Sequence, residues 1–428
     1  MKQSKFIEIF NQEVIPALGC TEPIAVALAT ATCAKHLGKP IERAEIFLSG
    51  NIMKNGVGVG IPGTGMVGLH IAAALGITGG DCTKELEVLN GVTKEQIESA
   101  KKLAKSGVIK INLKEKVDKL YIEANCYCGN DHSRALICGS HTNIVLAEVN
   151  GTVVFQKSCT AFTDTKKESP TAGTGHKMSV KMIWDFINEV PISEIEYVLN
   201  GIELNFAIAL EGLSGDYGLR VGKILRRSVE KENLGDDTPN WGMALSAAAS
   251  DARMAGSTLS VMSNSGSGNQ GIAVSLPIYA AHERFKTSKE QFVRALYLGN
   301  LIAIHLKEFM FRLSALCGVV TAATGAACGI AYLLGGELAQ INSTIKNMIG
   351  NISGMICDGA KAGCALKVST AVNAAFQSAF LAMENIEISE FDGIIEKDIE
   401  KTIKNLATVA SIGMETTDKV ILDIMSCK

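Results

Sequence analysis

The chain has 428 residues, with a high aliphatic content, few aromatic side chains and a near-neutral charge. Aromatic residues make up only 5% of it, whereas glycine occurs 42 times, so we expect a core of small and aliphatic side chains with closely packed backbones. The 41 basic and 44 acidic residues give a net charge of −3, which argues against a polybasic nucleic-acid-binding surface and against an acidic tail. Long disordered regions are not expected, because the hydrophobic content of 47% is high and the charged content of 20% is low.

The twelve cysteines do not form the pattern of a disulfide framework. The first 19 residues contain Glu8 and Glu13 and lack the apolar run of a secretory signal, so we expect a cytoplasmic protein. In a reducing compartment cysteines more often bind metals or take part in catalysis than form disulfides.

Two helices are predicted at the start of the chain. The first covers residues 5–18 and ends at Gly19. The second opens at the sequence Cys-Thr-Glu-Pro (20–23), with Thr21 as its candidate cap, and ends at Gly38.

The pattern then changes to short runs rich in β-branched residues, which predict strands. These runs cover residues 44–50, 108–113, 119–128, 134–139, 142–150 and 152–158, with helix expected within 83–107. From about residue 178 onward almost every segment has helical periodicity. The sequence therefore predicts an α+β fold: a large, mainly helical domain (1–40 and 165–428) with an inserted α+β domain (41–164) near the N-terminus.

Two uncharged stretches, 55–80 and 313–336, are long enough to span a membrane. Glycines and Pro62 in the first indicate a loop and a buried helix, and the small residues of the second fit a helix buried in a bundle. We therefore expect no membrane contact and keep a membrane or scaffold protein as one alternative.

The pattern G-x-G-x-x-G occurs three times, which is a weak signal in so glycine-rich a chain. A dinucleotide site also requires a preceding strand and a following helix, and Pro62 interrupts the first match. A nicotinamide-dependent oxidoreductase using the Gly-rich segment 56–68 is the alternative from another enzyme class.

A Ser/Asn/Gly loop at 263–271 leads into a predicted apolar helix. Backbone N–H groups and the positive end of a helix dipole favour an anion at such a place, and a carboxylate fits as well as a phosphate. Ser265, Ser267, Asn269 and Gln270 are its candidate binding residues.

No C-x-x-C pair is present, so zinc-finger and ferredoxin spacings are absent. Cys20, Cys317 and Cys357 stand apart because they lie at predicted helix starts or in a glycine-flanked turn, with Cys364 shortly after. A helix start favours the thiolate form.

Six motifs together identify a resemblance that covers nearly the whole chain. They are LGCTEP (18–23), SGNIMKNGVGVGIPGTG (49–65), CGSHTNI (138–144), SNSGSGNQGI (263–272), ALCG (315–318) and GMICDGAKAGC (354–364). The chain resembles the iron–sulfur L-cysteine desulfidases, which are relatives of the serine dehydratase alpha chain.

This resemblance implies a [4Fe-4S] cluster held by Cys20, Cys317 and Cys357. Cys364 resembles a ligand position of the serine dehydratase relatives at a shorter spacing from Cys357, and Cys427 is a further candidate at the C-terminus. The implied reaction is the β-elimination of L-cysteine to pyruvate, ammonia and hydrogen sulfide. An iron–sulfur L-serine dehydratase, which differs in its leaving group, is the nearest alternative.

The remaining expectations concern the residues around the substrate. His141 is the first candidate for the catalytic base and Lys54 the second, because an unperturbed histidine titrates near neutral pH. Thr21, Asn51 and Asn55 are expected beside the loop at 263–271 in binding the substrate. Pyridoxal phosphate and nucleic acid are not expected, and a homodimer is the default assembly.

Overall fold

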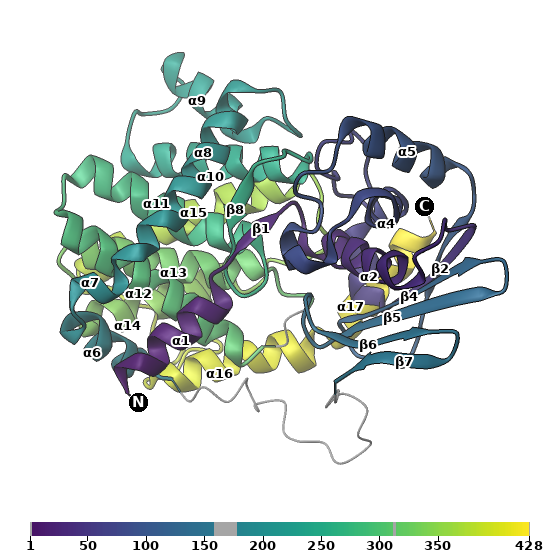
Figure 1. The fold of residues 1–428 in the computed structure, drawn as a ribbon. Coiled ribbons are helices and arrows are strands. Elements are labelled where there is room, and N and C mark those ends of the chain that lie inside the picture. Colours follow the sequence, from purple (N-terminus) through teal and green to yellow (C-terminus); the bar gives the residue numbers. More distant parts are fainter. Residues whose placement is uncertain (1, 158–177, 311–313, 428) are drawn as a thin grey trace.

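The computed structural model describes residues 2–157, 178–310 and 314–427, which form a helical part and a sheet part lying side by side (Figure 1). This architecture confirms the predicted α+β fold with a large helical portion. The predicted domain boundary at 164/165 lies outside the described residues. The division into two domains therefore stays a prediction.

The sheet has six strands in the order β3-β2-β4-β5-β6-β7. The strands β2 and β3 are parallel and every other neighbouring pair is antiparallel. The bounds are β2 Arg43–Leu48, β3 Ile109–Leu113, β4 Tyr121–Cys128, β5 Asp131–Cys138, β6 Ile144–Val149 and β7 Thr152–Gln156. Each predicted strand is thus confirmed within a few residues.

Helices cover one face of this sheet. The helix α2 (Thr21–Leu37) packs on β4 and β5 and against α4 (Leu69–Gly79), and α4 in turn packs on α5 (Lys94–Lys105). A left-handed Gly38 ends α2, as predicted. The α2 side chains share the hydrophobic core of the sheet part, so the chain enters this core well before residue 41.

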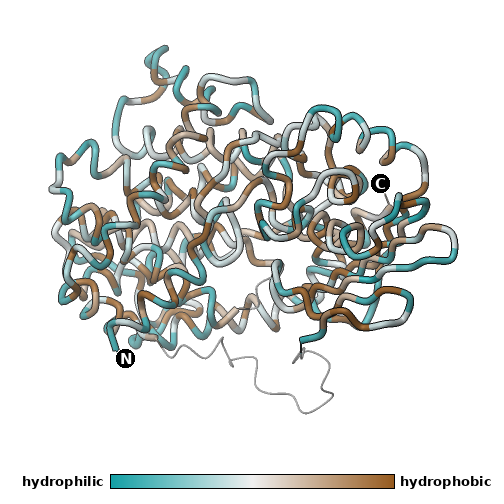
Figure 2. Tube along the Cα trace, in the orientation of Figure 1, coloured by the Kyte–Doolittle hydropathy of each residue, from teal (hydrophilic) through white to brown (hydrophobic). Residues whose placement is uncertain are grey.

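The helical part is a bundle in which α10 and α13 are surrounded by other helices. Apolar segments gather inside it, and hydrophilic segments such as α9 lie on the outside (Figure 2). Its helices are α1 Gln3–Glu13, α6 Val180–Glu189, α7 Ile192–Ile195, α8 Leu199–Ser214, α9 Val221–Glu230, α10 Thr238–Met254, α11 Gly268–Phe285, α12 Lys289–Glu308, α13 Gly318–Leu333, α14 Leu338–Ile352, α15 Cys364–Met383 and α16 Ile399–Thr408. Two further helices, α3 Gly50–Gly56 and α17 Glu415–Ser426, contact each other beside the sheet.

Small residues allow α12 and α13 to approach closely. A Cβ atom added to Gly325 would lie 2.1 Å from the carbonyl oxygen of Gly299, which no real side chain tolerates. The apolar stretch that forms α13 is therefore a buried bundle helix, as predicted. In the described ranges no helix combines the length and the apolar character needed to cross a membrane.

The predicted helix over residues 5–18 was wrong at its C-terminal end. The helix α1 ends at Glu13, and Pro16–Leu18 forms a short strand, β1, paired with β8 (Ser260–Met262). Proline disfavours helical geometry in the residue before it, which explains the early end. This pairing holds the N-terminal segment beside the loop at 263–271.

Candidate functional site

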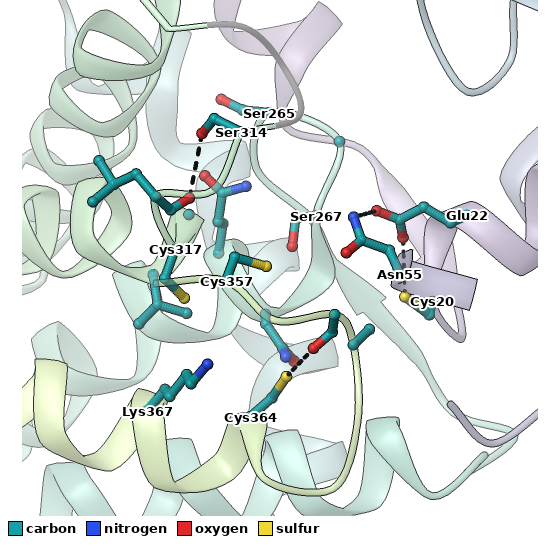
Figure 3. Close-up of a pocket in the computed structure, with 18 of the residues that line it drawn as sticks. Cys20, Glu22, Asn55, Ser265, Ser267, Ser314, Cys317, Cys357, Cys364 and Lys367 are labelled. Carbon is teal, nitrogen blue, oxygen red and sulfur yellow. Dashed lines mark hydrogen bonds between the residues drawn. The ribbon is translucent and has the colours of Figure 1, made fainter. Parts of the chain in front are cut away.

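A pocket lies where the N-termini of α2, α11, α13 and α15 come together (Figure 3). It encloses about 770 Å³, counting the open space at its mouth. Four cysteines line it together with polar and charged side chains from both parts of the fold. The lining residues are Cys20, Glu22, Asn55, His141, Arg253, Ser265, Gly266, Ser267, Asn269, Gln270, Lys307, Ser314, Leu316, Cys317, Gly318, Val319, Cys357, Gly359, Ala360, Cys364 and Lys367.

Local structure places the predicted cysteine ligands around this pocket. Cys20 is the N-cap of α2 and Cys317 the N-cap of α13. The N–H of Cys317 donates to the Met355 carbonyl oxygen (2.9 Å), and the N–H of Cys357 donates to the Ala315 carbonyl oxygen (2.6 Å). These two hydrogen bonds hold Cys317 and Cys357 on adjacent backbones, although 40 residues of sequence separate them.

The thiols are free and buried or partly buried. Burial raises the pKa of Cys317 to about 12, and the nearby Cys357 and Cys364 contribute in the same direction. Burial and the Glu22 carboxylate raise the pKa of Cys20 well above its ordinary value. The expectation that a helix start favours the thiolate is therefore wrong for Cys20, because desolvation outweighs the helix dipole.

A carboxylate stands beside Cys20 in the pocket. Glu22 accepts hydrogen bonds from the Cys20 thiol (3.1 Å), from the Thr21 hydroxyl (3.2 Å) and from the Asn55 amide (3.0 Å). Burial by itself would raise the pKa of Glu22, but the interaction with a protonated His141 and the hydrogen bonds from Cys20 and Asn55 lower it below its ordinary value. Glu22 is therefore an anion placed between Cys20, Asn55 and His141.

The loop at 263–271 forms the opposite wall. The Ser265 N–H donates to the carbonyl oxygen of Glu13, the last residue of α1, and the Ser263 N–H donates to that of Ile15, at 2.9 Å each. Ser267 is the N-cap of α11, and its side chain makes no capping hydrogen bond. Gln270 accepts a hydrogen bond from Thr321 at 3.3 Å, which ties the loop to α13.

Three buried polar atoms around the pocket, all in the described part of the chain, have no hydrogen-bond partner. They are Asn55 Oδ1, Asn269 Oδ1 and Arg253 Nε. Unsatisfied buried polar atoms are rare in folded proteins, because each costs free energy. These three atoms are therefore available to hydrogen-bond with a polar ligand in the pocket.

The structure brings most of the predicted site residues together and leaves some apart. Asn55, His141, Ser265, Ser267, Asn269 and Gln270 line the pocket with Cys20, Cys317, Cys357 and Cys364. Thr21 is outside the lining and contacts Glu22, and as the first residue of α2 it is not the predicted cap. Cys427 is exposed at the end of α17, away from this lining.

Lys54 and Asn51 also lie outside the pocket. The Lys54 ammonium donates to Asp418 of α17 (2.6 Å) and to the Cys357 carbonyl oxygen (3.1 Å). The Asn51 amide donates to the same carboxylate at 3.2 Å. Both side chains face a second cavity between α3 and α17.

Sequence reasoning missed several residues of the pocket. Glu22 lies inside the motif LGCTEP and could have been found there. Lys367 follows Cys364 by three residues, so helical spacing places both on one face of α15. Arg253, Lys307 and Ser314 gave no local signal.

The glycine-rich segment 56–68 does not have the context of a dinucleotide site. It follows a helix, α3, and it closes on itself through a bridge between Gly60 and Val67. A Cβ atom on Gly60 would lie 2.4 Å from the backbone of Ala255. Its glycines therefore serve close backbone packing, and the strand that a nicotinamide site requires is missing before it.

No three His, Cys, Asp or Glu side chains of the described ranges lie close enough together to ligate a single metal ion. A cluster makes a different demand, because each cysteine binds a different iron and the sulfur atoms do not converge on one point.

Comparison with known proteins places the chain in a family. The family model described as serine dehydratase alpha chain matches residues 83–423. A UPF0597 protein of Parabacteroides distasonis is 47% identical over 100% of this chain and 98% of its own length. UPF0597 proteins of Oleidesulfovibrio alaskensis and Porphyromonas gingivalis are 46% and 44% identical over 99% and 100% of this chain, covering 98% and 99% of their own lengths. The chain therefore belongs to the serine dehydratase alpha chain family.

Proposed function

We propose that the chain is a carbon–sulfur lyase, an L-cysteine desulfidase that depends on a [4Fe-4S] cluster. The observation that carries the proposal is the pocket in which Cys20, Cys317 and Cys357 meet a carboxylate, an imidazole and a helix N-terminus. Family membership supports lyase chemistry on a small amino acid.

The donor set fits such a cluster. Three free thiols come from three separate elements to one cavity, and thiolates are the usual ligands of iron–sulfur clusters. Buried thiols with raised pKa values need a strong positive partner before they lose their protons. Lys367 and Arg253 supply positive charge nearby. Cys364 lines the same pocket and is a fourth candidate ligand.

When bound, a cluster held by three cysteines supplies a Lewis-acidic iron with an open position for the substrate sulfur. The chain's own residues supply the rest. His141 takes the Cα proton, and Glu22 stabilises the imidazolium that results. The electron pair of the broken C–H bond forms the Cα–Cβ double bond, and the Cβ–S bond breaks with release of sulfide. The aminoacrylate product tautomerises and reacts with water to give pyruvate and ammonia.

Lys54 is less suited than His141 to act as the base. Its ammonium is engaged by Asp418 and by a backbone carbonyl oxygen, and it does not line the pocket. We therefore assign Lys54 to the support of the Cys357 turn.

The test is an anaerobic preparation in which iron, acid-labile sulfide and sulfide release from L-cysteine are measured together. We expect about four iron atoms per chain, and loss of both iron and activity in Cys317→Ala. Cys328→Ala is the matched control, because Cys328 is also buried on α13 but does not line the pocket. A reconstituted sample without iron, or equal effects of the two variants, would overturn the proposal.

L-Serine dehydration is the second candidate, favoured by the description of the matching family model. The two reactions differ only in the leaving group, so kcat/KM for L-cysteine against L-serine separates them. A reducing cytoplasmic location and a homodimer complete the proposal; light scattering of the anaerobic protein tests the dimer.

A further inference from the structure

Arg253 is a buried cation whose side chain has no ion pair among the described residues. It lies at the end of α10, is 2% exposed and lines the pocket. Its Nε atom has no hydrogen-bond partner, and no carboxylate of the described ranges lies within ion-pair distance of the guanidinium. A buried charge without a partner is costly, which makes such an arginine exceptional.

This guanidinium lies against the N-terminus of α11. A Cβ atom on Gly268, the first residue of α11, would be 2.3 Å from Arg253 Nε. The absence of a side chain at Gly268 therefore allows the guanidinium to reach the first turn. That turn contains no acidic residue, and no side chain caps it. Two positive groups thus adjoin, since the N-terminus of an 18-residue helix carries a partial positive charge.

The nearby acids are engaged elsewhere. Asp251, two residues before Arg253, accepts a hydrogen bond from the Gly222 N–H at 3.1 Å, at the start of α9. Glu22 accepts hydrogen bonds from Cys20 and Asn55. The part of the chain that the structure describes therefore supplies no anion that balances Arg253 and the α11 N-terminus.

We propose that Arg253 and the first turn of α11 together bind the α-carboxylate of the substrate. The planar guanidinium matches a carboxylate with two parallel hydrogen bonds, which the first-turn N–H groups complement. Asn269 Oδ1, buried and without a partner in the same wall, accepts a hydrogen bond from the substrate ammonium. The site then selects free α-amino acids over amines that carry a thiol but no carboxylate. This inference rests on the proposed function only in taking an amino acid as the substrate.

The first test compares substrates in the anaerobic holoenzyme. Arg253→Met should lower kcat/KM for L-cysteine by about ten- to a hundredfold, since hydrogen bonds to charged groups are worth that much. It should leave sulfide release from L-cysteine methyl ester, which keeps the acidic Cα proton but lacks the carboxylate charge, within about twofold of the wild type. Arg253→Lys keeps the charge but loses the two parallel hydrogen bonds, so its kcat/KM for L-cysteine should lie between those of the wild type and Arg253→Met. Arg284→Met, which removes an exposed arginine paired with Asp236, controls for net charge.

The second test does not depend on lyase activity. Calorimetry with pyruvate as the probe should give a dissociation constant at least about tenfold weaker in Arg253→Met than in the wild type or in Arg284→Met. The ligand-free Arg253→Met protein should melt no lower than the wild type, because an unpaired buried charge has been removed.

Unchanged pyruvate affinity in Arg253→Met would overturn the inference. If that variant also lost iron, the arginine would be assigned to the cluster instead. If Arg253 proves to bind pyruvate but no sulfide is released from L-cysteine, the inference stands and the proposed function fails.

Discussion

Lys54 forms a buried ion pair with Asp418, and substitutions of this pair can test whether Lys54 has a structural role or acts as the catalytic base. The Lys54 side chain is 2% exposed and that of Asp418 15% exposed, and the two charged atoms lie 2.6 Å apart. Lys54→Met removes one partner and leaves a carboxylate in a mostly buried place. Such a loss costs about 3 kcal/mol, at the lower end for buried pairs because Asp418 retains some solvent contact.

The expected change in melting temperature follows from the size of the chain. With an unfolding entropy of roughly 2 cal/mol/K per residue, a chain of this length that unfolds as one unit loses about 3 °C for 3 kcal/mol. The double variant Lys54→Met/Asp418→Leu removes both charges and should recover most of that loss. Lys419→Met, which removes an exposed lysine next to Asp418, should change the melting temperature by less than about 1 °C.

The assay combines thermal unfolding followed by circular dichroism with iron content and sulfide release. Lys54→Met should lower iron retention together with stability, because Lys54 also holds the carbonyl oxygen of Cys357. The double variant separates the effect of the charge from that of this hydrogen bond. A Lys54→Met protein with unchanged stability and full iron content, but without activity, would refute the supporting role and restore Lys54 as a candidate base.

Two further predictions concern the walls of the site and the sheet. Gly271→Ala should destabilise the protein by about 3 kcal/mol or more, because its Cβ atom would lie 1.9 Å from the Met262 carbonyl oxygen. The control is Gly354→Ala. Gly354 has open space around it, so this variant should change the free energy of unfolding by less than about 0.5 kcal/mol. Equal urea midpoints for the two variants would contradict this packing. Burial would raise the pKa of Glu123, but hydrogen bonds led by that from Lys114 lower it to about 2. Its stabilising contribution is therefore complete above about pH 4.5 and disappears as the pH falls to about 2, so Glu123→Gln should cost about 2 to 3 kcal/mol at pH 7 and almost nothing near pH 2. A cost that does not depend on pH would refute the assignment.

Much of the secondary structure could be predicted from local patterns. Alternating burial along β2 and the glycine that ends α2 are properties of a few neighbouring residues, so periodicity and backbone preference were enough. The same reasoning failed at residues 14–18, where pairing with β8 decided the conformation. A strand partner almost 250 residues away leaves no trace in the local pattern.

The candidate site was only partly accessible to sequence reasoning. Motifs singled out Cys20, Cys317 and Cys357, and the pocket brings these three together. Lys54 belongs to an equally prominent motif, yet it pairs with Asp418 of α17 and lines another cavity. Arg253 carried no signal at all, because what distinguishes it is the absence of a partner in three dimensions.

Local patterns were therefore sufficient for most helices and strands, and for the residue types that can ligate a metal or exchange a proton. They did not reveal which of these residues share a pocket, or which charges are already neutralised. Backbone preferences and side-chain periodicity act within only a few residues. The pairing, burial and desolvation that set a site's chemistry depend on contacts between segments far apart in the chain.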